Sequence, residues 1–234
     1  MERVEDLQYK DLKIIQDDLL YTFTSDSVVL ANFINIKKNE NAVEIGCGSG
    51  VISILLTAKT DVEKITAFEI QKEMSDLAEK NIKLNQFEDR IKIINDDISD
   101  FEKYIEKAKT DVVFSNPPFM NSSVGNSNIV KNIARHDEKL PPSKLCECAS
   151  KILKDKGRFY LVYLPERLCE ILVCLHQNKL QPKRMFFTQN DKHQIKLCVI
   201  EAVKNGKKGL KILPNLTVND NNGKYLETLH TKYF

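Results

Sequence analysis

The sequence predicts an α/β fold around a mostly parallel sheet, and three observations support this prediction. Short apolar runs alternate with amphipathic stretches, which is typical of parallel strands joined by crossover helices. The 234 residues, 42% hydrophobic and 29% charged, suffice for one domain with a sizeable core and exclude a collagen-like, disordered or membrane-spanning chain. Glycine-rich or polar groups follow several apolar runs, at the positions where open α/β sheets bind ligands.

The periodicity of the chain assigns most elements in order. Six apolar runs are expected to be strands, at 42–46, 65–70, 91–94, 111–115, 158–164 and 195–203. Apolar residues at helical spacing predict helices within 144–154 and 168–175, each burying one face. The polar stretch after Phe119, closed by a Pro-Pro pair, is expected to be a loop or lid, and the segment from Asn205 onward should be irregular with room for one more strand.

Charge is distributed unevenly along the chain. The net charge is +2, but residues 1–150 carry 19 basic against 26 acidic side chains and residues 151–234 carry 16 against 7. The basic second part fits a polyanionic partner, and a lysine-rich solvated surface explains it equally well. The charged N-terminus without a secretory signal, and 6 cysteines that form no ligand set, predict a cytoplasmic protein with reduced thiols and no metal.

A glycine-rich turn follows the first expected strand. The segment VEIGCGSG at 43–50 places Gly46, Gly48 and Gly50 at alternate positions, just before a helix-forming stretch. Glycines permit a tight turn, leave room for a ligand and aim a helix N-terminus at it. The spacing differs from the GxGxxG of dinucleotide-binding proteins, so the turn by itself predicts only a nucleotide-like ligand.

Three further strand ends carry polar groups. The second expected strand ends at Glu69, whose carboxylate can accept hydrogen bonds from both hydroxyls of a ribose; a solvated strand end is the alternative. The third strand ends in DDI at 96–98, and the fourth in SNPPF at 115–119. Because parallel strands end at the same edge of a sheet, we expect these groups in a row with the glycine turn.

This row of motifs resembles the S-adenosylmethionine-dependent methyltransferases of the Rossmann-like class. NPPF at 116–119 is similar to the [DNS]PP[YFW] motif of members that methylate planar amino nitrogens. The resemblance implies a Rossmann-like methyltransferase fold, with a mostly parallel central sheet, helices on both faces and an antiparallel C-terminal strand. It also implies S-adenosylmethionine as the cofactor.

The resemblance assigns a cofactor site. The three glycines would wrap the methionine end of the cofactor with Glu44 beneath them, Glu69 would hold the ribose, and Asp97 with the Ile98 N–H would read the adenine. FTSD at 23–26 is similar to a segment that closes over the cofactor, and a helix N-cap at Ser25 or Asp26 is the alternative. The whole expected cofactor set is Phe23, Ser25, Asp26, Glu44, Gly46, Gly48, Gly50, Glu69, Ile70, Asp97, Ile98 and Asn116.

The NPPF segment also has a chemical rationale of its own. An exocyclic amino nitrogen is a poor nucleophile because its lone pair is delocalised into the ring. If the Asn116 side-chain oxygen and the Pro117 carbonyl each accept one N–H, the lone pair turns toward the methyl donor, and no strong general base is needed. Pro118 stiffens the loop and Phe119 offers a stacking face, so we expect all four residues to be catalytic. A Pro-Pro turn would explain the prolines but not their neighbours.

Several segments resemble the bacterial tRNA(Val) adenine-N6 methyltransferase family, which modifies the adenine beside the anticodon. They are ARHDE at 134–138, LPERL at 164–168, LQPKR at 180–184 and GKY at 223–225. Phe119 stands where the family usually has Tyr, and Asp137 where it often has Glu. The resemblance implies methylation of adenine N6 in tRNA, at position 37. Guanine-N2 methylation of ribosomal RNA, glutamine-N5 methylation of a protein, and a non-catalytic RNA-binding module are the alternatives.

We expect a single domain, 1–234, in which 1–35 is an extension that closes over the cofactor, 36–204 the catalytic core and 205–234 a tail. The tRNA substrate is expected to meet Arg135 and His136 of the lid, for which a salt-bridged lid is the alternative. A basic track on the same side as the catalytic loop is expected from Lys183, Arg184, Lys207 and Lys208. No membrane, metal or oligomer is implied.

Overall fold

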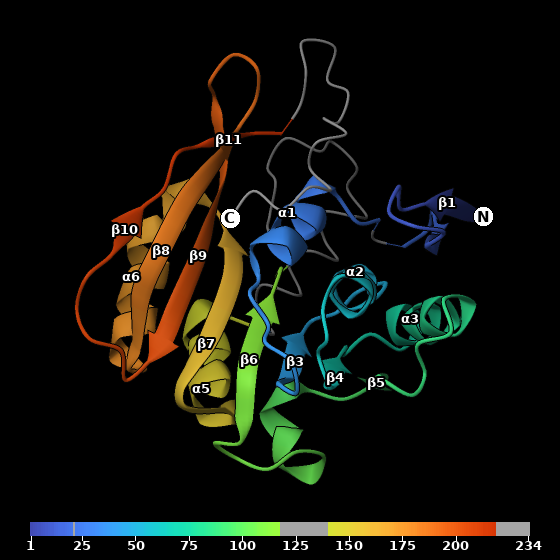
Figure 1. Ribbon diagram of the computed structural model, residues 1–234, viewed down its shortest axis with the longest axis horizontal. Coiled ribbons are helices and arrows are strands. Elements are labelled where there is room, and N and C mark those ends of the chain that lie inside the picture. The colour runs from blue at the N-terminus through green and yellow to red at the C-terminus, as the bar shows by residue number, and fades with distance from the viewer. Residues whose placement is uncertain (21, 118–139, 219–234) are drawn as a thin grey trace.

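The computed structural model describes residues 1–20, 22–117 and 140–218, and its strands form two sheets (Figure 1). The strands of the small sheet are β1 (Glu2–Asp6) and β2 (Lys13–Asp17). The strands of the 9-stranded sheet are β3 (Asn41–Ile45), β4 (Lys64–Phe68), β5 (Ile91–Ile94), β6 (Thr110–Ser115), β7 (Leu153–Tyr163), β8 (Leu180–Gln189), β9 (Ile195–Lys204), β10 (Lys211–Ile212) and β11 (Leu216–Thr217). The helices are α1 (Ser25–Phe33), α2 (Val51–Lys59), α3 (Lys72–Leu84), η1 (Ile98–Lys103), α5 (Pro142–Ile152), η2 (Pro165–Arg167) and α6 (Leu168–Gln177).

The large sheet is mostly parallel, as predicted. Its order is β10-β8-β9-β7-β6-β3-β4-β5, with β11 paired to β8. The neighbours from β7 to β5 are all parallel, whereas β9 is antiparallel to both β7 and β8. β8 therefore runs in the same direction as β6 and β7. β6, which is buried at every residue, fits the middle of a parallel sheet that is covered on both faces.

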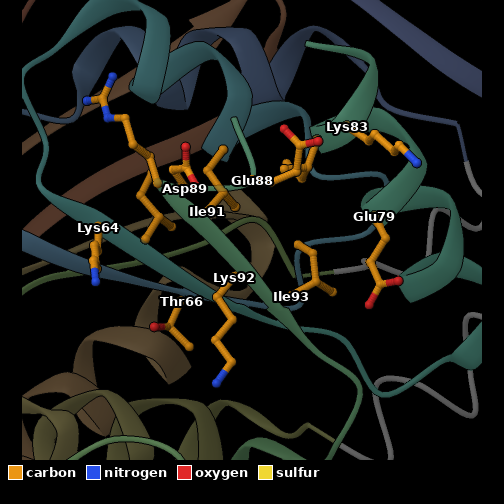
Figure 2. A pocket seen from close by; sticks show the side chains of 12 residues that line it. Lys64, Thr66, Glu79, Lys83, Glu88, Asp89, Ile91, Lys92 and Ile93 are labelled. Atoms are coloured by element: carbon orange, nitrogen blue, oxygen red, sulfur yellow. The ribbon is translucent and has the colours of Figure 1, made fainter. Parts of the chain in front are cut away.

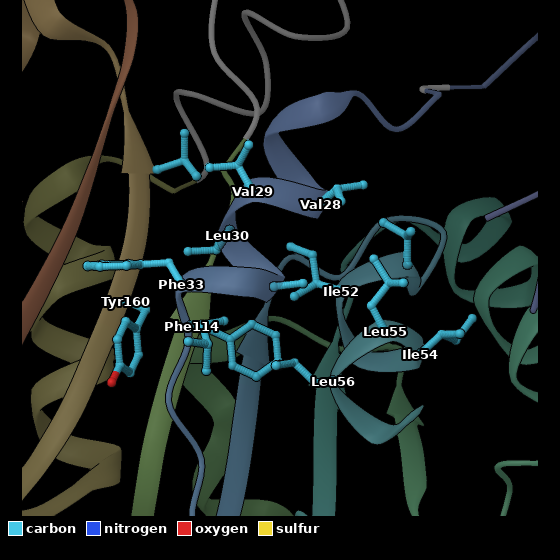
Figure 3. Close-up of a cluster of buried hydrophobic side chains, with 14 of the residues drawn as sticks. Val28, Val29, Leu30, Phe33, Ile52, Ile54, Leu55, Leu56, Phe114 and Tyr160 are labelled. Carbon is cyan, nitrogen blue, oxygen red and sulfur yellow. The ribbon is translucent and has the colours of Figure 1, made fainter. Parts of the chain in front are cut away.

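Helices cover both faces of this sheet, again as predicted. Along β6, Val112 and Phe114 point into a core that contains α1 and α2, whereas Val113 points into a second core that contains α5 and α6. This alternation follows from the two-residue period of a strand. Figure 3 shows the first core, where Phe33 of α1 meets Tyr160 of β7 edge-on at a ring-centroid distance of 5.8 Å.

The N-terminal hairpin, β1 and β2, is an element that the sequence analysis does not predict. The backbone N–H groups of Ile15 and Lys13 donate to the side-chain oxygens of Asn81 (2.6 Å) and Asn85 (3.0 Å) on α3. The amide nitrogens of the same asparagines donate back to the Ile15 and Lys13 carbonyls, at 3.1 and 2.7 Å. One helical turn of four residues rises about 6 Å and two strand residues about 6.6 Å, so this asparagine pair matches alternate strand residues. The pair thereby completes the hydrogen bonding of an edge strand.

Other differences from the sequence predictions have local causes. β8 escapes prediction because polar residues and Pro182 interrupt its apolar pattern; the register with β9 shifts between Pro182 and Arg184. β7 begins at Leu153, inside the range expected to be helical, and the tail contributes two short strands, β10 and β11. Among the described residues, no helix has the length and apolar character needed to cross a membrane.

Candidate active site

Four parallel strands end together at one edge of the large sheet. Ile45 at the end of β3 is level with Phe68 of β4, which is level with Ile94 of β5. At the end of β6, the Ser115 hydroxyl donates to the Ile45 carbonyl at 2.7 Å and so ties that strand to β3. The structure thus brings together the glycine turn, Glu69, the DDI segment and the start of NPPF, as the sequence predicts.

The glycine loop between β3 and α2 needs its glycines for different reasons. Gly46, Gly48 and Gly50 have φ angles of +72°, +54° and +83°, a conformation that other residues adopt only with strain. A Cβ at Gly50 would lie 3.5 Å from the Cβ of Ala78, so this glycine also lets α3 approach. A Cβ at Gly46 would meet nothing within 4 Å, so the loop leaves open space above Gly46.

Glu69 organises two loops from the end of β4. One carboxylate oxygen accepts the Gly48 N–H and the other the Gln71 N–H, both at 3.0 Å. The side chain is buried, and burial raises the pKa of Glu69, although these two hydrogen bonds oppose the shift. Each oxygen retains a second lone pair, so the ribose contact expected of Glu69 stays a prediction that this geometry permits.

Glu44 lies beneath the glycine loop and is fully buried, with 0% of its surface exposed. Its Oε2 accepts a hydrogen bond from the Ser53 hydroxyl of α2, while Oε1 is buried without a partner among the described residues. Burial raises the pKa of Glu44 to about 8. The hydrogen bonds from Ser53 oppose this shift, and the charge of Glu69 adds to it. A buried acceptor without a partner is costly, so this oxygen is available to a donor above it.

Asp97 starts the 3-10 helix η1 and is already engaged at both oxygens. It accepts the Ser99 N–H at 2.8 Å, and Lys144 of α5 donates to its other oxygen at 3.1 Å. Burial opposes ionisation of Asp97, but these two partners outweigh it and lower the pKa. Ile98 is buried beside it, whereas Ile70, directly after Glu69, is 39% exposed and offers an apolar face at the same edge.

The FTSD segment enters α1 beside this edge. Phe23 is half-buried, and its N–H donates to the side chain of Gln16 at 3.1 Å, which links the segment to the hairpin. The Thr24 hydroxyl donates to Asp26 at 2.7 Å and the Ser25 hydroxyl donates to it at 3.3 Å. The N-cap of α1 is Thr24, so the alternative of an N-cap at Ser25 or Asp26 is wrong. Contact of this segment with the cofactor stays a prediction.

Asn116 follows β6 directly and contacts α1. Its side-chain nitrogen donates to the hydroxyl oxygen of Ser27 at 3.1 Å. The amide oxygen, on the other end, is the group left to accept a hydrogen bond from a substrate. Pro117 is buried. Pro118, Phe119, Arg135 and His136 lie outside the described residues, so the structure leaves their predicted roles as predictions.

The expected basic track does not gather at the catalytic edge. Lys207 and Lys208 follow the end of β9, next to the start of β8, because Leu180 pairs with Lys204. This is the edge of the sheet opposite the ends of β3 to β6, so the prediction that the track faces the catalytic loop is wrong for these two lysines. Lys183 donates to the Lys207 carbonyl at 3.3 Å. Their contact with RNA stays a prediction.

Arg184 is engaged within the fold. Its Nε pairs with Glu201 of β9, and its guanidinium lies 4.7 Å from the centre of the Phe33 ring. The ion pair joins β8 to β9 and the ring contact joins β8 to α1, which gives this arginine a structural role beside the RNA contact expected of it.

A pocket of about 550 Å³ lies elsewhere, around the outer strand β5 (Figure 2). Charged side chains of both signs line it, among them Lys64, Glu79, Asp89 and Lys92. Neither the glycine loop nor Glu69, Asp97 or Asn116 contributes to it. The pocket is therefore separate from the site at the strand ends.

Residues 23–173, which include the ends of β3 to β6, match the methyltransferase small domain. The chain belongs to this methyltransferase family. Its relatives include two proteins named tRNA1(Val) (adenine(37)-N6)-methyltransferase. The relative from Dyadobacter fermentans is 27% identical, and the match covers 85% of this chain and 82% of the relative's length. The relative from Tolumonas auensis is 30% identical, and the match covers 71% of this chain and 69% of the relative's length. The family resemblance inferred from NPPF and the later segments is confirmed.

Solved structures support the methyltransferase fold. A predicted O-methyltransferase from Agrobacterium tumefaciens superposes with a TM-score of 0.70 at 17% identity, covering 88% of this chain and 96% of its own. TYW2 from M. jannaschii, solved in complex with AdoMet, reaches 0.60 at 17% identity and covers 86% and 85%. The predicted Rossmann-like class is confirmed.

S-adenosylmethionine is the cofactor of this methyltransferase, and the strand-end residues fit it. Open space above Gly46 accommodates a ligand where a side chain would fill it. The partnerless Glu44 Oε1 beneath the loop suits a cationic or N–H donor, and S-adenosylmethionine carries an ammonium group. The exposed Ile70 adds an apolar face beside Glu69.

Sequence reasoning missed four residues that support this methyltransferase site: Ser27, Ser53, Asn81 and Lys144. The spacing of Asn81 and Asn85, one helical turn apart in KNIKLN, is a signal that could have indicated a polar helix face against backbone. Ser27, Ser53 and Lys144 carry no signal of this kind, because each is defined only by a partner on another element.

Proposed function

We propose that this protein transfers a methyl group from S-adenosylmethionine to N6 of an adenine in tRNA, at position 37 beside the anticodon. The observation that carries the proposal is the position of Asn116, whose amide nitrogen is held by Ser27 at the edge that also carries the glycine loop. The names of the relatives from D. fermentans and T. auensis support the choice of tRNA and of adenine.

The residues of the chain act by orienting the amino group. The Asn116 side-chain oxygen accepts one N–H and the Pro117 carbonyl the other, which draws the nitrogen toward tetrahedral geometry and exposes its lone pair. S-adenosylmethionine supplies the electrophilic methyl group. Ser115 holds the start of the loop through its bond to the Ile45 carbonyl, so the acceptors and the glycine loop keep their relative positions. The amino proton becomes acidic on methyl transfer and can pass to water.

The cofactor contacts are part of the proposal. Glu69 accepts the ribose hydroxyls with the lone pairs that Gly48 and Gln71 leave free, and Asp97 with the Ile98 N–H reads the adenine. Phe23 and the rest of the FTSD segment close over the site from the hairpin side.

The alternatives have less support. Guanine-N2 methylation of ribosomal RNA and glutamine-N5 methylation both use a similar acceptor motif, but the curated relatives at 27–31% identity are named for tRNA adenine-N6 methylation. A non-catalytic RNA-binding module would not need the buried carboxyls and the held amide at one edge.

The tRNA contacts are proposed from two groups. Arg135 and His136 follow the catalytic loop in sequence, which favours contact with the anticodon arm. Lys183, Lys207 and Lys208 would reach only RNA that extends around β8 to the opposite edge. We further propose a cytoplasmic location, where tRNA is present, and catalysis without a metal, since Asn116 and Pro117 need none to orient the amino group.

The proposal is tested by digesting tRNA methylated in vitro and identifying the modified nucleoside, which should be N6-methyladenosine. Asn116→Ala should lower kcat by roughly 10²–10³, as loss of an oriented polar group does at other active sites. The affinity for S-adenosylmethionine, measured by calorimetry, should change little, because the glycine loop and the acidic strand ends are intact. An Asn116→Ala protein that methylates tRNA at the wild-type rate would contradict the proposed mechanism.

A further inference from the structure

The side-chain amide of Asn116 is held from the N-terminal part of the chain. Its nitrogen donates to the Ser27 hydroxyl oxygen at 3.1 Å, and Ser27 is 5% exposed. An asparagine amide can turn by half a rotation with little change of shape, which exchanges its oxygen and nitrogen. In the arrangement observed, the nitrogen end is bonded to Ser27, so the oxygen end is the one left to face a substrate.

We infer that Ser27 is a positioning residue for methyl transfer: its hydrogen bond to the Asn116 side-chain amide fixes the place of that amide, so that the Asn116 oxygen reaches the adenine amino group. The inference rests on the proposed function, in which that oxygen accepts an amino N–H. A serine hydroxyl can accept or donate, so the bond to Ser27 fixes where the amide lies, and the adenine amino group, a donor, pairs with the end that presents the oxygen. Ser27 acts through Asn116 and has no contact with the adenine in this scheme.

Both ends of this hydrogen bond belong to well-packed elements. Ser27 lies in the first turn of α1, and the next three residues, Val28, Val29 and Leu30, are buried against α2 and the sheet (Figure 3). The backbone N–H of Ser27 donates to the Thr24 carbonyl at 3.1 Å. At the other end, the Ser115 hydroxyl ties the residue before Asn116 to β3. Packing of this kind holds a functional group at the required position.

Two matched variants separate the hydrogen bond from packing. Ser27→Thr and Ser27→Val have nearly the same shape and differ in the hydroxyl oxygen. We expect kcat of Ser27→Val to be about 5- to 10-fold below that of Ser27→Thr, the factor for one hydrogen bond. The KM for tRNA and the affinity for S-adenosylmethionine should be equal in the two. If the larger side chains of these two variants disturb folding, Ser27→Ala replaces them, because it removes the hydroxyl without adding volume. Its kcat should then be about 5- to 10-fold below that of the wild type.

A remote serine serves as control. Ser150 lies near the end of α5, beside the start of β7 at the opposite edge of the sheet, and its backbone carbonyl accepts the Lys204 ammonium. Ser150→Ala should leave kcat unchanged.

A double-mutant cycle tests whether Ser27 acts through Asn116. In single-turnover assays of the Asn116→Ala protein, Ser27→Val should cause no further loss, because the bond is already absent. Two results would overturn the inference while the wild-type protein still methylates tRNA. One is an equal kcat for Ser27→Thr and Ser27→Val. The other is that Ser27→Val slows the Asn116→Ala protein by the same factor as it slows the wild type. A wild-type protein that leaves tRNA adenine unmethylated would overturn the proposed function, and this inference with it.

Discussion

The glycine loop and the N-terminal hairpin are held beside the same site by different chemistry. Two buried carboxyl groups support the glycine loop and the helix that follows it: Glu69 accepts the Gly48 and Gln71 N–H groups, and Glu44 accepts the Ser53 hydroxyl of α2. The hairpin lies on the asparagine pair, which bonds to the backbone of β2. Carboxyl groups titrate and amides do not, so the two regions should respond differently to pH.

The two regions meet at Asn81. Its side-chain nitrogen donates to the Ile15 carbonyl of the hairpin at 3.1 Å and to the Ser49 carbonyl of the glycine loop at 3.0 Å. One fully buried amide thus connects the segment before FTSD to the glycine loop. The comparison teaches that the hairpin is part of the support of the site, although none of its own residues is expected to contact the cofactor.

The largest expected effect concerns Glu44 and pH. Burial raises its pKa from 4.5 to about 8, so the folded protein binds this proton more tightly than the unfolded chain does. The stabilising contribution is complete below pH 4.5 and is lost as the pH rises through about 8. At 1.36 kcal/mol per pKa unit, the titration of Glu44 lowers the free energy of unfolding by roughly 3–5 kcal/mol as the pH rises from 4.5 to about 8.

Glu44→Gln removes this titration. Urea denaturation from about pH 5 to about pH 9 should show a flatter dependence for Glu44→Gln than for the wild type. Both proteins are measured without cofactor, so that only the Glu44 carboxyl group distinguishes the curve of the wild type from that of Glu44→Gln. Parallel curves would mean that Glu44 ionises normally in the folded protein.

Asn81→Ala should have the next largest effect. It leaves the Ile15 N–H, the Ile15 carbonyl and the Ser49 carbonyl without their partner, at a cost of about 2–3 kcal/mol in the free energy of unfolding. The loss should be the same at every pH tested, in contrast to that of Glu44. The affinity for S-adenosylmethionine should also fall, because Ser49 belongs to the glycine loop; an unchanged affinity would show that the two regions are independent.

Asn85→Ala is the matched variant with the smallest expected effect. Asn85 makes the same pair of bonds to Lys13, but it is half-buried and Lys13 is exposed, so water can replace the lost amide. The loss of unfolding free energy should be about 0.5–1 kcal/mol, with no change in cofactor affinity. Equal losses for the Asn81 and Asn85 variants would show that burial does not account for the difference.

The strand-end row could be predicted because its evidence is local. β3 to β6 are short apolar runs, and Gly46, Glu69 and Asn116 follow them directly. β8 could not be predicted in the same way, since Pro182 and its polar neighbours hide the strand that pairing with β9 stabilises. The basic track was misplaced because Lys207 and Lys208 follow β9, which runs antiparallel to β7 and so ends at the edge opposite the ends of β3 to β6.

The sequence by itself determined the α/β class, the order of the polar strand ends and the acceptor motif, because periodicity and parallel direction follow from the pattern of each segment. Only the tertiary structure decided which partners hold those groups. Asn116 meets Ser27 across 89 residues, and Ile15 meets Asn81 across 66. A hydrogen bond acts over about 3 Å, so it depends on which faces of distant elements come together, and side-chain patterns along one element do not contain that information.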